Sequence, residues 1–404
     1  MGKRKIGLLP KILIAIALGI GAGLGLEWMH DSFSSTWISP VAEITARVFV
    51  TINGIFSQFL GFAIPLIIVG LVTTAIADIG NKAGKMLLIT VLIAYGSTIL
   101  AGFISYFTGA ALFPGMINTG AGMQELANTE ALAPFFEVNI PPLMGVMTAL
   151  VLSFTLGLGL ASTQNETLMK ATHGFEEIVV KTIKVAIIPL LPLYIFGIFL
   201  DMAYVGKVFG ILSVFIKIIG IIFAIHIGIL ILQFSIAGII ARKNPFRLLW
   251  NMLPAYFTAL GTQSSAATIP VTLEQTRKNG VSEDVAGFTV PLCATIHMSG
   301  STLKIVACAL ALMIMQGMPY SFGMFAGFIC MLGITMVAAP GVPGGAIMAS
   351  LGLLSSMLGF DAEAQGLMIA LYIAMDSFGT ACNVTGDGAI AVIIDRIAPG
   401  KRAE

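Results

Sequence analysis

The chain has 404 residues, of which 57% are hydrophobic and only 10% are charged, and its formal net charge is +1. Soluble domains carry about 25% charged residues, so this composition excludes an ordinary soluble protein. It predicts a polytopic membrane protein that is surrounded by lipid.

Apolar runs long enough to cross about 30 Å of hydrocarbon recur along the chain, and the gaps between them have the size of loops. The basic start MGKRK leads into the first run, which predicts a retained helix because the small-residue cleavage site of a signal peptide is weak. The runs are 8–27, 45–77, 86–112, 143–161, 178–202, 208–241, 285–316, 322–352 and 364–394.

The basic residues are distributed unevenly between the loops. Lys and Arg crowd both termini and the loop at 275–284, whereas the segments 28–40, 113–140 and 353–366 contain none. The positive-inside rule places the basic segments in the cytoplasm. We therefore expect a multi-pass protein of the plasma (inner) membrane with both termini inside the cell.

Two apolar segments near the C-terminus are interrupted by glycine, proline and small polar residues, at 260–272 and 337–350. Each break is too close to its neighbours for two full crossings, which predicts a helical hairpin that enters the membrane and returns. The backbone groups freed at such tips must be buried in protein or face a water-filled cavity.

Each predicted hairpin precedes a long apolar helix that contains polar residues, at 285–316 and at 364–394. The first hairpin opens from the cytoplasm and the second from outside. Two such units of opposite orientation are typical of an inverted-repeat transporter whose site lies near the midplane of the membrane.

Four polar residues of the last helix, Asp376, Thr380, Asn383 and Asp387, stand at i, i+4, i+7 and i+11. On a helix they fall within a stripe about 60° wide. A polar seam between helices is one interpretation, but hydroxyl groups alone would serve it. Two carboxylates favour a cation site, since oxygen ligands suit Na⁺ and a lone carboxylate suits a substrate ammonium.

The other polar helix contains CATIHMSGST (293–302), where Gly300 among hydroxyl residues favours local unwinding and the release of carbonyl ligands. His297, Ser301 and Lys304 would share one helix face at i, i+4 and i+7. The histidine is either a neutral packing residue or, with the lysine, a candidate for ion coupling.

Four segments resemble the signatures of one family, the dicarboxylate/amino acid:cation symporters. They are TQSSAATIPVT (262–272), ATIHMSG (294–300), PGVPGGAIM (340–348) and NVTGD (383–387). The family includes the archaeal glutamate transporter homologue and the mammalian excitatory and neutral amino acid carriers. The similarity extends over essentially the whole chain.

The resemblance implies an all-α membrane protein with eight transmembrane helices, two re-entrant hairpins and an elevator mechanism. It also implies a homotrimer. Residues 1–84 and 113–207 would form a scaffold, whereas 85–112 and 208–404 would form the moving transport domain.

Carried over residue by residue, the resemblance implies a substrate site on the hairpins and the last helix. Asp376 would hold the α-ammonium, and Ser265, Asn383 and the backbone of 342–344 would meet the α-carboxylate. The full set is Ser264, Ser265, Val342, Pro343, Gly344, Asp376, Gly379, Thr380 and Asn383.

The resemblance also implies two sodium sites. One would join the Asp387 carboxylate to the backbone carbonyls of Cys293, His297 and Asn383. The other would use the Met298 sulfur with the carbonyls of Thr295, Met336, Val337 and Ala339.

The family's third sodium site falls here on Tyr95, Thr98, Ile99, His297 and Ser299, so its carboxylate and one hydroxyl are missing. We expect this site to be lost or altered. Proton coupling, with Lys304 and His297 as candidates, stays open.

Two departures from the family concern the substrate. Gly379 stands where glutamate and aspartate carriers have an arginine, and Gln263 stands where the archaeal homologues keep one in the first hairpin. An acidic side chain would therefore lack its bidentate partner. Asp376 argues for an amine in the substrate. We therefore expect a neutral amino acid-like member that imports serine, threonine or alanine with Na⁺, and Gly379→Arg to shift preference toward aspartate.

Other functions stay as alternatives. An acidic amino acid or a C4-dicarboxylate is the nearest, and a passive channel is more remote. An intramembrane protease would need two adjacent carboxylates, whereas Asp376 and Asp387 are about 16 Å apart along one helix. We therefore expect a transporter and not an enzyme, with a small-molecule substrate and no nucleic-acid partner.

Overall fold

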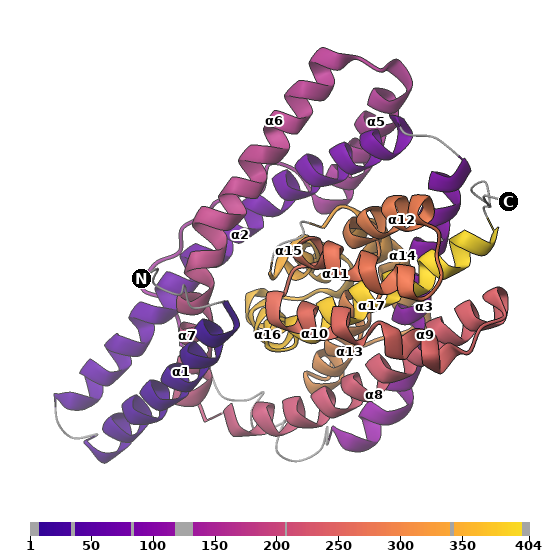
Figure 1. Cartoon of the computed structure of the whole chain (residues 1–404). Helices are drawn as coiled ribbons and strands as arrows, with labels where there is room; N and C mark the ends of the chain where they lie inside the picture. The colour runs from indigo at the N-terminus through magenta and orange to yellow at the C-terminus, as the bar shows by residue number, and fades with distance from the viewer. Residues whose placement is uncertain are drawn as a thin grey trace, which may run out of the picture.

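The structure is a computed structural model that describes residues 8–33, 37–81, 85–117, 132–206, 208–339 and 343–397. All of its regular secondary structure in these ranges is helical (Figure 1). Eight helical stretches among the described residues are long and apolar enough to cross a membrane. The prediction of an all-α membrane protein is confirmed.

The helices of the N-terminal half are mostly long. They are α1 (Leu8–Ser32), α2 (Ile38–Asn81), α3 (Lys85–Met116), α5 (Val146–Thr163), α6 (Glu166–Thr182), the π-helix η1 (Ile183–Ile187), α7 (Ile188–Tyr204) and α8 (Val208–Ala241).

The helices of the C-terminal half are shorter. They are α9 (Pro245–Asn251), α10 (Leu253–Thr262), α11 (Ser265–Lys278), α12 (Glu283–Ile296), α13 (Ser299–Met315), α14 (Phe322–Val337), α15 (Gly345–Leu358), α16 (Ala362–Ala374) and α17 (Asp376–Ile397).

Two pairs of consecutive helices pack together where the hairpins were predicted, and their re-entry into the membrane stays a prediction. Helix α10 packs against α11, and α14 packs against α15. At the first tip Gln263 adopts a left-handed conformation (φ 53°) and Ser264 caps α11. At the second tip Gly344, with φ 76°, precedes α15. The left-handed Gln263 ends α10 and allows the chain to reverse, whereas Gly344 is the N-cap of α15.

A broken helix follows each hairpin. The first break separates α12 from α13 at His297 and Met298; the backbone is extended at His297 and non-helical at Met298. The second separates α16 from α17 at Met375. The order of hairpin and broken helix therefore occurs twice.

The position of the first break corrects two expectations. Unwinding was expected around Gly300, but Gly300 lies inside α13. A Cβ there would lie 2.5 Å from both Cys382 Cβ and the Gly379 carbonyl oxygen. The glycine therefore serves close packing. Because the break separates His297 from α13, His297 does not share a continuous helix face with Ser301 and Lys304.

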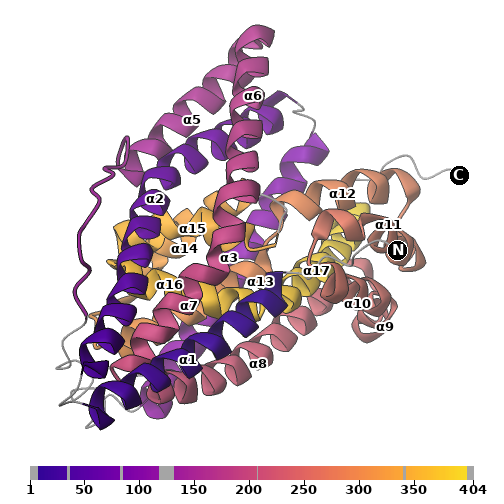
Figure 2. The same ribbon diagram turned by 90° about the vertical axis from the view of Figure 1, so that its left-hand side faces the viewer.

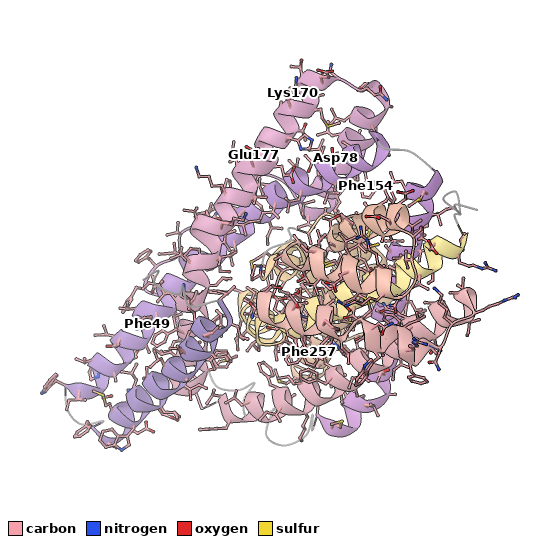
Figure 3. The ribbon with its side chains drawn as sticks, viewed as in Figure 1. Phe49, Asp78, Phe154, Lys170, Glu177 and Phe257 are labelled. Carbon is pink, nitrogen blue, oxygen red and sulfur yellow. The ribbon has the colours of Figure 1, made fainter. Side chains whose placement is uncertain are left out.

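The helices pack in two groups (Figures 1 and 2). Helices α1, α2, α5, α6 and α7 contact one another, and α3 packs with α8–α17. At the far end of the first group, Asp78 of α2 lies near the charged part of α6 that carries Lys170 and Glu177 (Figure 3). There Asp78 Oδ1 lies 3.3 Å from His173 Nε2.

Helix α13 is the centre of the second group, since all of its residues are buried. It contacts α3, α8, α14, α16 and α17. A helix that is covered on every side needs apolar or paired residues throughout, so its one lysine, Lys304, requires partners inside the protein.

Small residues allow α1 to lie directly on α7. A Cβ on Gly23 would overlap the Leu200 carbonyl oxygen, whereas a Cβ on Gly25 would meet nothing within 4 Å. We expect Gly23→Leu to separate the helices and to destabilise the protein by about 1–3 kcal/mol.

The measurement is the midpoint of thermal unfolding in detergent. Gly25→Leu on the same helix is the matched control and should leave the midpoint unchanged. Equal losses in the two variants would show that the contact with Leu200 is unimportant.

Candidate functional site

The first two residues of α17 hold the tips of both hairpins. The Gly344 N–H donates to Asp376 Oδ2 at 2.8 Å, and Gln263 Nε2 donates to Ser377 Oγ at 2.9 Å. Asp376 and Ser377 are only 5% and 7% exposed. Segments more than a hundred residues apart therefore meet at the start of α17.

The predicted polar stripe lies on an unbroken helix. Asp376, Thr380, Asn383 and Asp387 all belong to α17, and all are buried. The Thr380 hydroxyl donates to the Asp376 carbonyl oxygen at 3.1 Å, within its own helix. The other three side chains contact neighbouring segments.

Asn383 joins α17 to the break between α12 and α13. Its Oδ1 accepts from the Gly300 N–H at 2.8 Å, which belongs to the first turn of α13 and has no intrahelical partner. Its Nδ2 donates to Ser301 Oγ at 3.2 Å and to Met298 Sδ at 3.4 Å. The amide thus stabilises the broken segment.

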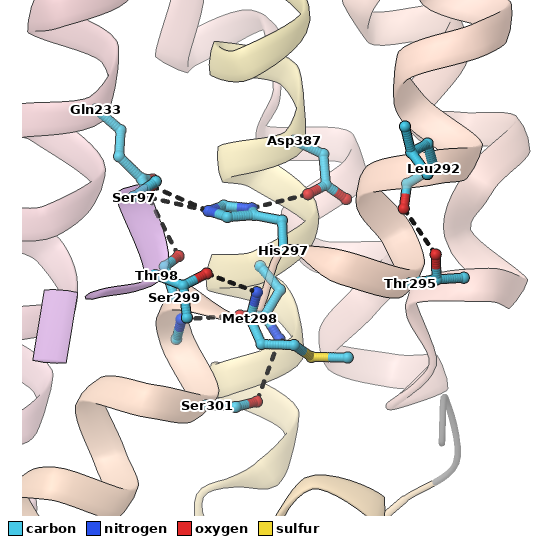
Figure 4. A network of polar contacts seen from close by, with 12 residues as sticks. Ser97, Thr98, Gln233, Leu292, Thr295, His297, Met298, Ser299, Ser301 and Asp387 are labelled. Carbon is cyan, nitrogen blue, oxygen red and sulfur yellow. Dashed lines mark hydrogen bonds and ion pairs between the residues drawn. The ribbon is translucent and has the colours of Figure 1, made fainter. Parts of the chain in front are cut away.

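Asp387 contacts the other side of the break. Its Oδ1 lies 2.9 Å from His297 Nδ1, and both side chains are fully enclosed. His297 Nε2 lies 3.1 Å from Ser97 Oγ, which also accepts from Gln233 Nε2 at 2.9 Å (Figure 4). Because Nδ1 donates to the carboxylate, Nε2 of a neutral ring accepts from Ser97.

The same network involves the residues expected at the altered third sodium site. Ser299 Oγ accepts from Gln233 Nε2 at 3.1 Å, and Thr98 Oγ1 accepts from the Met298 N–H at 3.2 Å (Figure 4). The Tyr95 hydroxyl instead donates to the Cys330 carbonyl oxygen. Imidazole, amide and hydroxyl groups thus occupy this region.

Lys304 is buried among three partners. Its Nζ lies 3.7 Å from Asp376 Oδ1, donates to the Met375 carbonyl oxygen at 3.0 Å and lies 3.9 Å from the centre of the Tyr372 ring. His297 therefore pairs with Asp387, and Lys304 pairs with Asp376. The two residues were expected to lie together on one helix face, and that expectation is wrong.

Gly379 faces Lys304. A Cβ on Gly379 would overlap both Nζ and Cε of the lysine. The glycine therefore provides the space that the ammonium occupies. An arginine at this position would require Lys304 to move. A change of substrate preference in Gly379→Arg would therefore report on the displaced lysine as well as on the added guanidinium.

The candidate sodium ligands lie at helix ends. Helix α12 ends at Ile296, α14 ends at Val337, and the two helices are in contact. The last carbonyls of a helix carry partial negative charge and lack the regular i+4 donor, although the Met336 carbonyl accepts from the Ala339 N–H at 3.2 Å. The carbonyls of Thr295, Met336, Val337 and Ala339 lie at these ends. Backbone oxygens of this kind are the ligand type that a hard cation such as Na⁺ prefers.

The remaining candidates lie near helix starts. Ser265 begins α11 and is buried, whereas Ser264 Oγ caps that helix by accepting from the Ala267 N–H. Pro343 and Gly344 precede α15, and the candidate Val342 lies outside the described residues. Helix N-termini attract anionic groups such as a carboxylate.

Several residues of the site were missed by sequence analysis. Gln233 is a lone amide in the apolar run 208–241, and that isolation is a signal. Ser377 adjoins Asp376 but was not selected. Tyr372 and the Met375 carbonyl carry no sequence signal, because only the break in the helix brings them to Lys304.

Hairpin tips gathered on a broken helix, with buried charges and helix ends around them, define a secondary transporter. The model of the sodium:dicarboxylate symporter family matches residues 8–397. The chain belongs to this family of membrane transporters, and it is not an enzyme.

Individual relatives are more distant. The chain is 25% identical to the serine/threonine transporter SstT of Acinetobacter baumannii, over 97% of both chains. It is 31% identical to the neutral amino acid transporter B(0) of Rattus norvegicus and 34% identical to excitatory amino acid transporter 3 of Mus musculus. These matches cover 43% and 40% of this chain, and 32% and 31% of those carriers.

The role of Asn383 can be tested by stability. Asn383→Leu would leave the buried Gly300 N–H without a partner, at a cost of about 1–3 kcal/mol. We expect a lower midpoint of thermal unfolding in detergent.

Thr380→Val is the control on the same helix face, because its hydroxyl bonds only within α17. It should lower the midpoint much less. Equal effects of the two substitutions would contradict the role of Asn383 in holding the break.

Proposed function

We propose that the protein is a Na⁺-driven symporter that imports a small neutral amino acid such as serine, threonine or alanine. The observation that carries the proposal is the buried carboxylate of Asp376 at the junction of both hairpin tips. A carboxylate beside the starts of α11 and α15 suits a zwitterion, whose ammonium and carboxylate need opposite partners. The full-length similarity to a serine/threonine transporter supports this class.

In this proposal Asp376 binds the substrate ammonium, and the α-carboxylate lies near Ser265, Asn383 and the backbone of 342–344. Thr380 lies one turn further along the same face of α17. Gly379 contributes no side chain, and Gln263 is directed to Ser377. The absence of a guanidinium at both positions supports a neutral substrate side chain.

Two sodium ions are proposed. One uses the Asp387 carboxylate with the carbonyls of Cys293, His297 and Asn383. The His297 ring uses only one oxygen of Asp387. The second uses the ends of α12 and α14 with the Met298 sulfur. When bound, these ions would add positive charge and couple substrate movement to the sodium gradient.

The two helix groups support an elevator mechanism. Residues 1–84 and 113–207 would form the scaffold, and 85–112 and 208–404 the transport domain. Helices α15 and α16 contact α2 and α7, with Gly352 facing Ile64 and Gly366 facing Ile198. Glycines at these positions let the helices approach closely without interlocking side chains, which favours sliding of one helix group against the other. We place both termini in the cytoplasm and propose that the scaffold assembles as a homotrimer.

One observation favours a second candidate. The Lys304 ammonium beside Gly379 is a cation that a second substrate carboxylate could use. An acidic amino acid or a C4-dicarboxylate is therefore the alternative substrate class.

The test is uptake into proteoliposomes. Under an inward sodium gradient, radiolabelled serine should accumulate, and unlabelled threonine or alanine should compete with it. Succinate should not compete, because it lacks the ammonium that Asp376 would bind.

Collapse of the sodium gradient should abolish accumulation. Uptake of succinate without any neutral amino acid would reject the neutral class and support the alternative.

A further inference from the structure

Lys304 and Asp376 form an ion pair inside the protein. Their side chains are 2% and 7% exposed, and the Nζ–Oδ1 distance of 3.7 Å is longer than a hydrogen bond. No function was assigned to this pair by sequence reasoning, which linked Lys304 to His297. The pair needs a separate explanation, since burying two charges is costly.

The pair competes with the proposed substrate. A substrate ammonium would need the same carboxylate, and Asp376 Oδ2 already accepts from the Gly344 N–H. A substrate ammonium at Oδ1 would bring a second positive charge beside Lys304, and repulsion between the two cations favours replacement of the lysine there. The lysine would keep two neutral partners, the Met375 carbonyl and the Tyr372 ring.

Neighbouring residues of α13, α16 and α17 hold the Lys304 side chain beside Asp376. Gly379 leaves the volume that the ammonium fills. The Tyr372 hydroxyl donates to Ser301 Oγ at 3.0 Å, and Ser301 also accepts from Asn383. The ring that faces the ammonium is thus fixed to α13, from which Lys304 itself projects.

The charge of Asp376 matters most when the transport domain moves back across the membrane without substrate. Net uptake requires the transport domain to cross back without an amino acid, whereas exchange of one amino acid for another does not. A buried carboxylate without a cationic partner would make that return costly, as unpaired charges at membrane depth are.

We propose that Lys304 is an internal substitute for the substrate ammonium, which neutralises Asp376 so that the transport domain returns without an amino acid. This inference rests on the proposed function. It makes Lys304 a positioning residue for the carboxylate and requires no contact between Lys304 and the substrate.

The experiment compares two fluxes of radiolabelled serine in proteoliposomes. Net uptake is measured into vesicles without internal serine, and exchange is measured with equal serine and sodium on both sides. Lys304→Met should retain exchange and lower the ratio of net uptake to exchange at least about tenfold. Both fluxes scale with the amount of folded protein, so the ratio is informative even for a poorly folding variant.

Two further variants serve as controls. Lys304→Arg keeps the positive charge, so its ratio of net uptake to exchange should be closer to the wild-type value than that of Lys304→Met. Lys217→Met removes an exposed lysine of α8 and should change neither flux.

An unchanged ratio in Lys304→Met overturns the inference while leaving the proposed function intact. Loss of exchange in a folded Lys304→Met variant, with binding of serine abolished, would also overturn it, because that result assigns Lys304 to the substrate itself. Wild-type protein that moves serine in neither assay rejects the proposed function and, with it, this inference.

Discussion

The arrangement of the second helix group, α3 with α8–α17, depends on the first two residues of α17. Asp376 and Ser377 accept hydrogen bonds from the tips of the second and first hairpins, respectively. Buried backbone and polar groups at a helix end need partners, and these two bonds supply them to the Gly344 N–H and the Gln263 amide. The break at Met375 allows this pairing, because it makes Asp376 the first residue of a new helix.

Close approach of α13 and α17 is the second constraint. Gly300 and Gly379 lie against each other, and a Cβ on Gly386 would lie 2.6 Å from His297 Cε1. Glycines at a helix crossing bring the backbones together, and polar side chains then reach across. In this protein the short distance allows Asn383 to bond to the Gly300 N–H and Asp387 to bond to His297.

Sequence patterns predicted the features that depend on spacing along one segment. The stripe from Asp376 to Asp387 follows from helical periodicity, and Pro343 and Gly344 precede α15 as the second break predicted. The first break was also predicted, although Gly261 and Pro270 lie inside helices and the reversal occurs at Gln263 and Ser264. Contacts across helix breaks could not be predicted in this way. Periodicity placed His297 and Lys304 on one face, but the chain leaves the helix at His297 and Met298, and His297 contacts another aspartate. Gly379 was selected for its missing side chain, whereas its neighbour Lys304 is visible only in three dimensions.

The two aspartates of α17 consequently have different environments. Asp387 is held by an imidazole within a network of serine and glutamine side chains. Asp376 lies between an ammonium and the backbone of a hairpin tip, so one carboxylate is connected to both. Because Oδ1 and Oδ2 belong to one carboxylate, a cation at Oδ1 also affects how strongly Oδ2 accepts from the Gly344 N–H. Lys304 and a substrate ammonium carry the same charge, so either one can stand beside Oδ1 while Oδ2 keeps its bond to the hairpin tip.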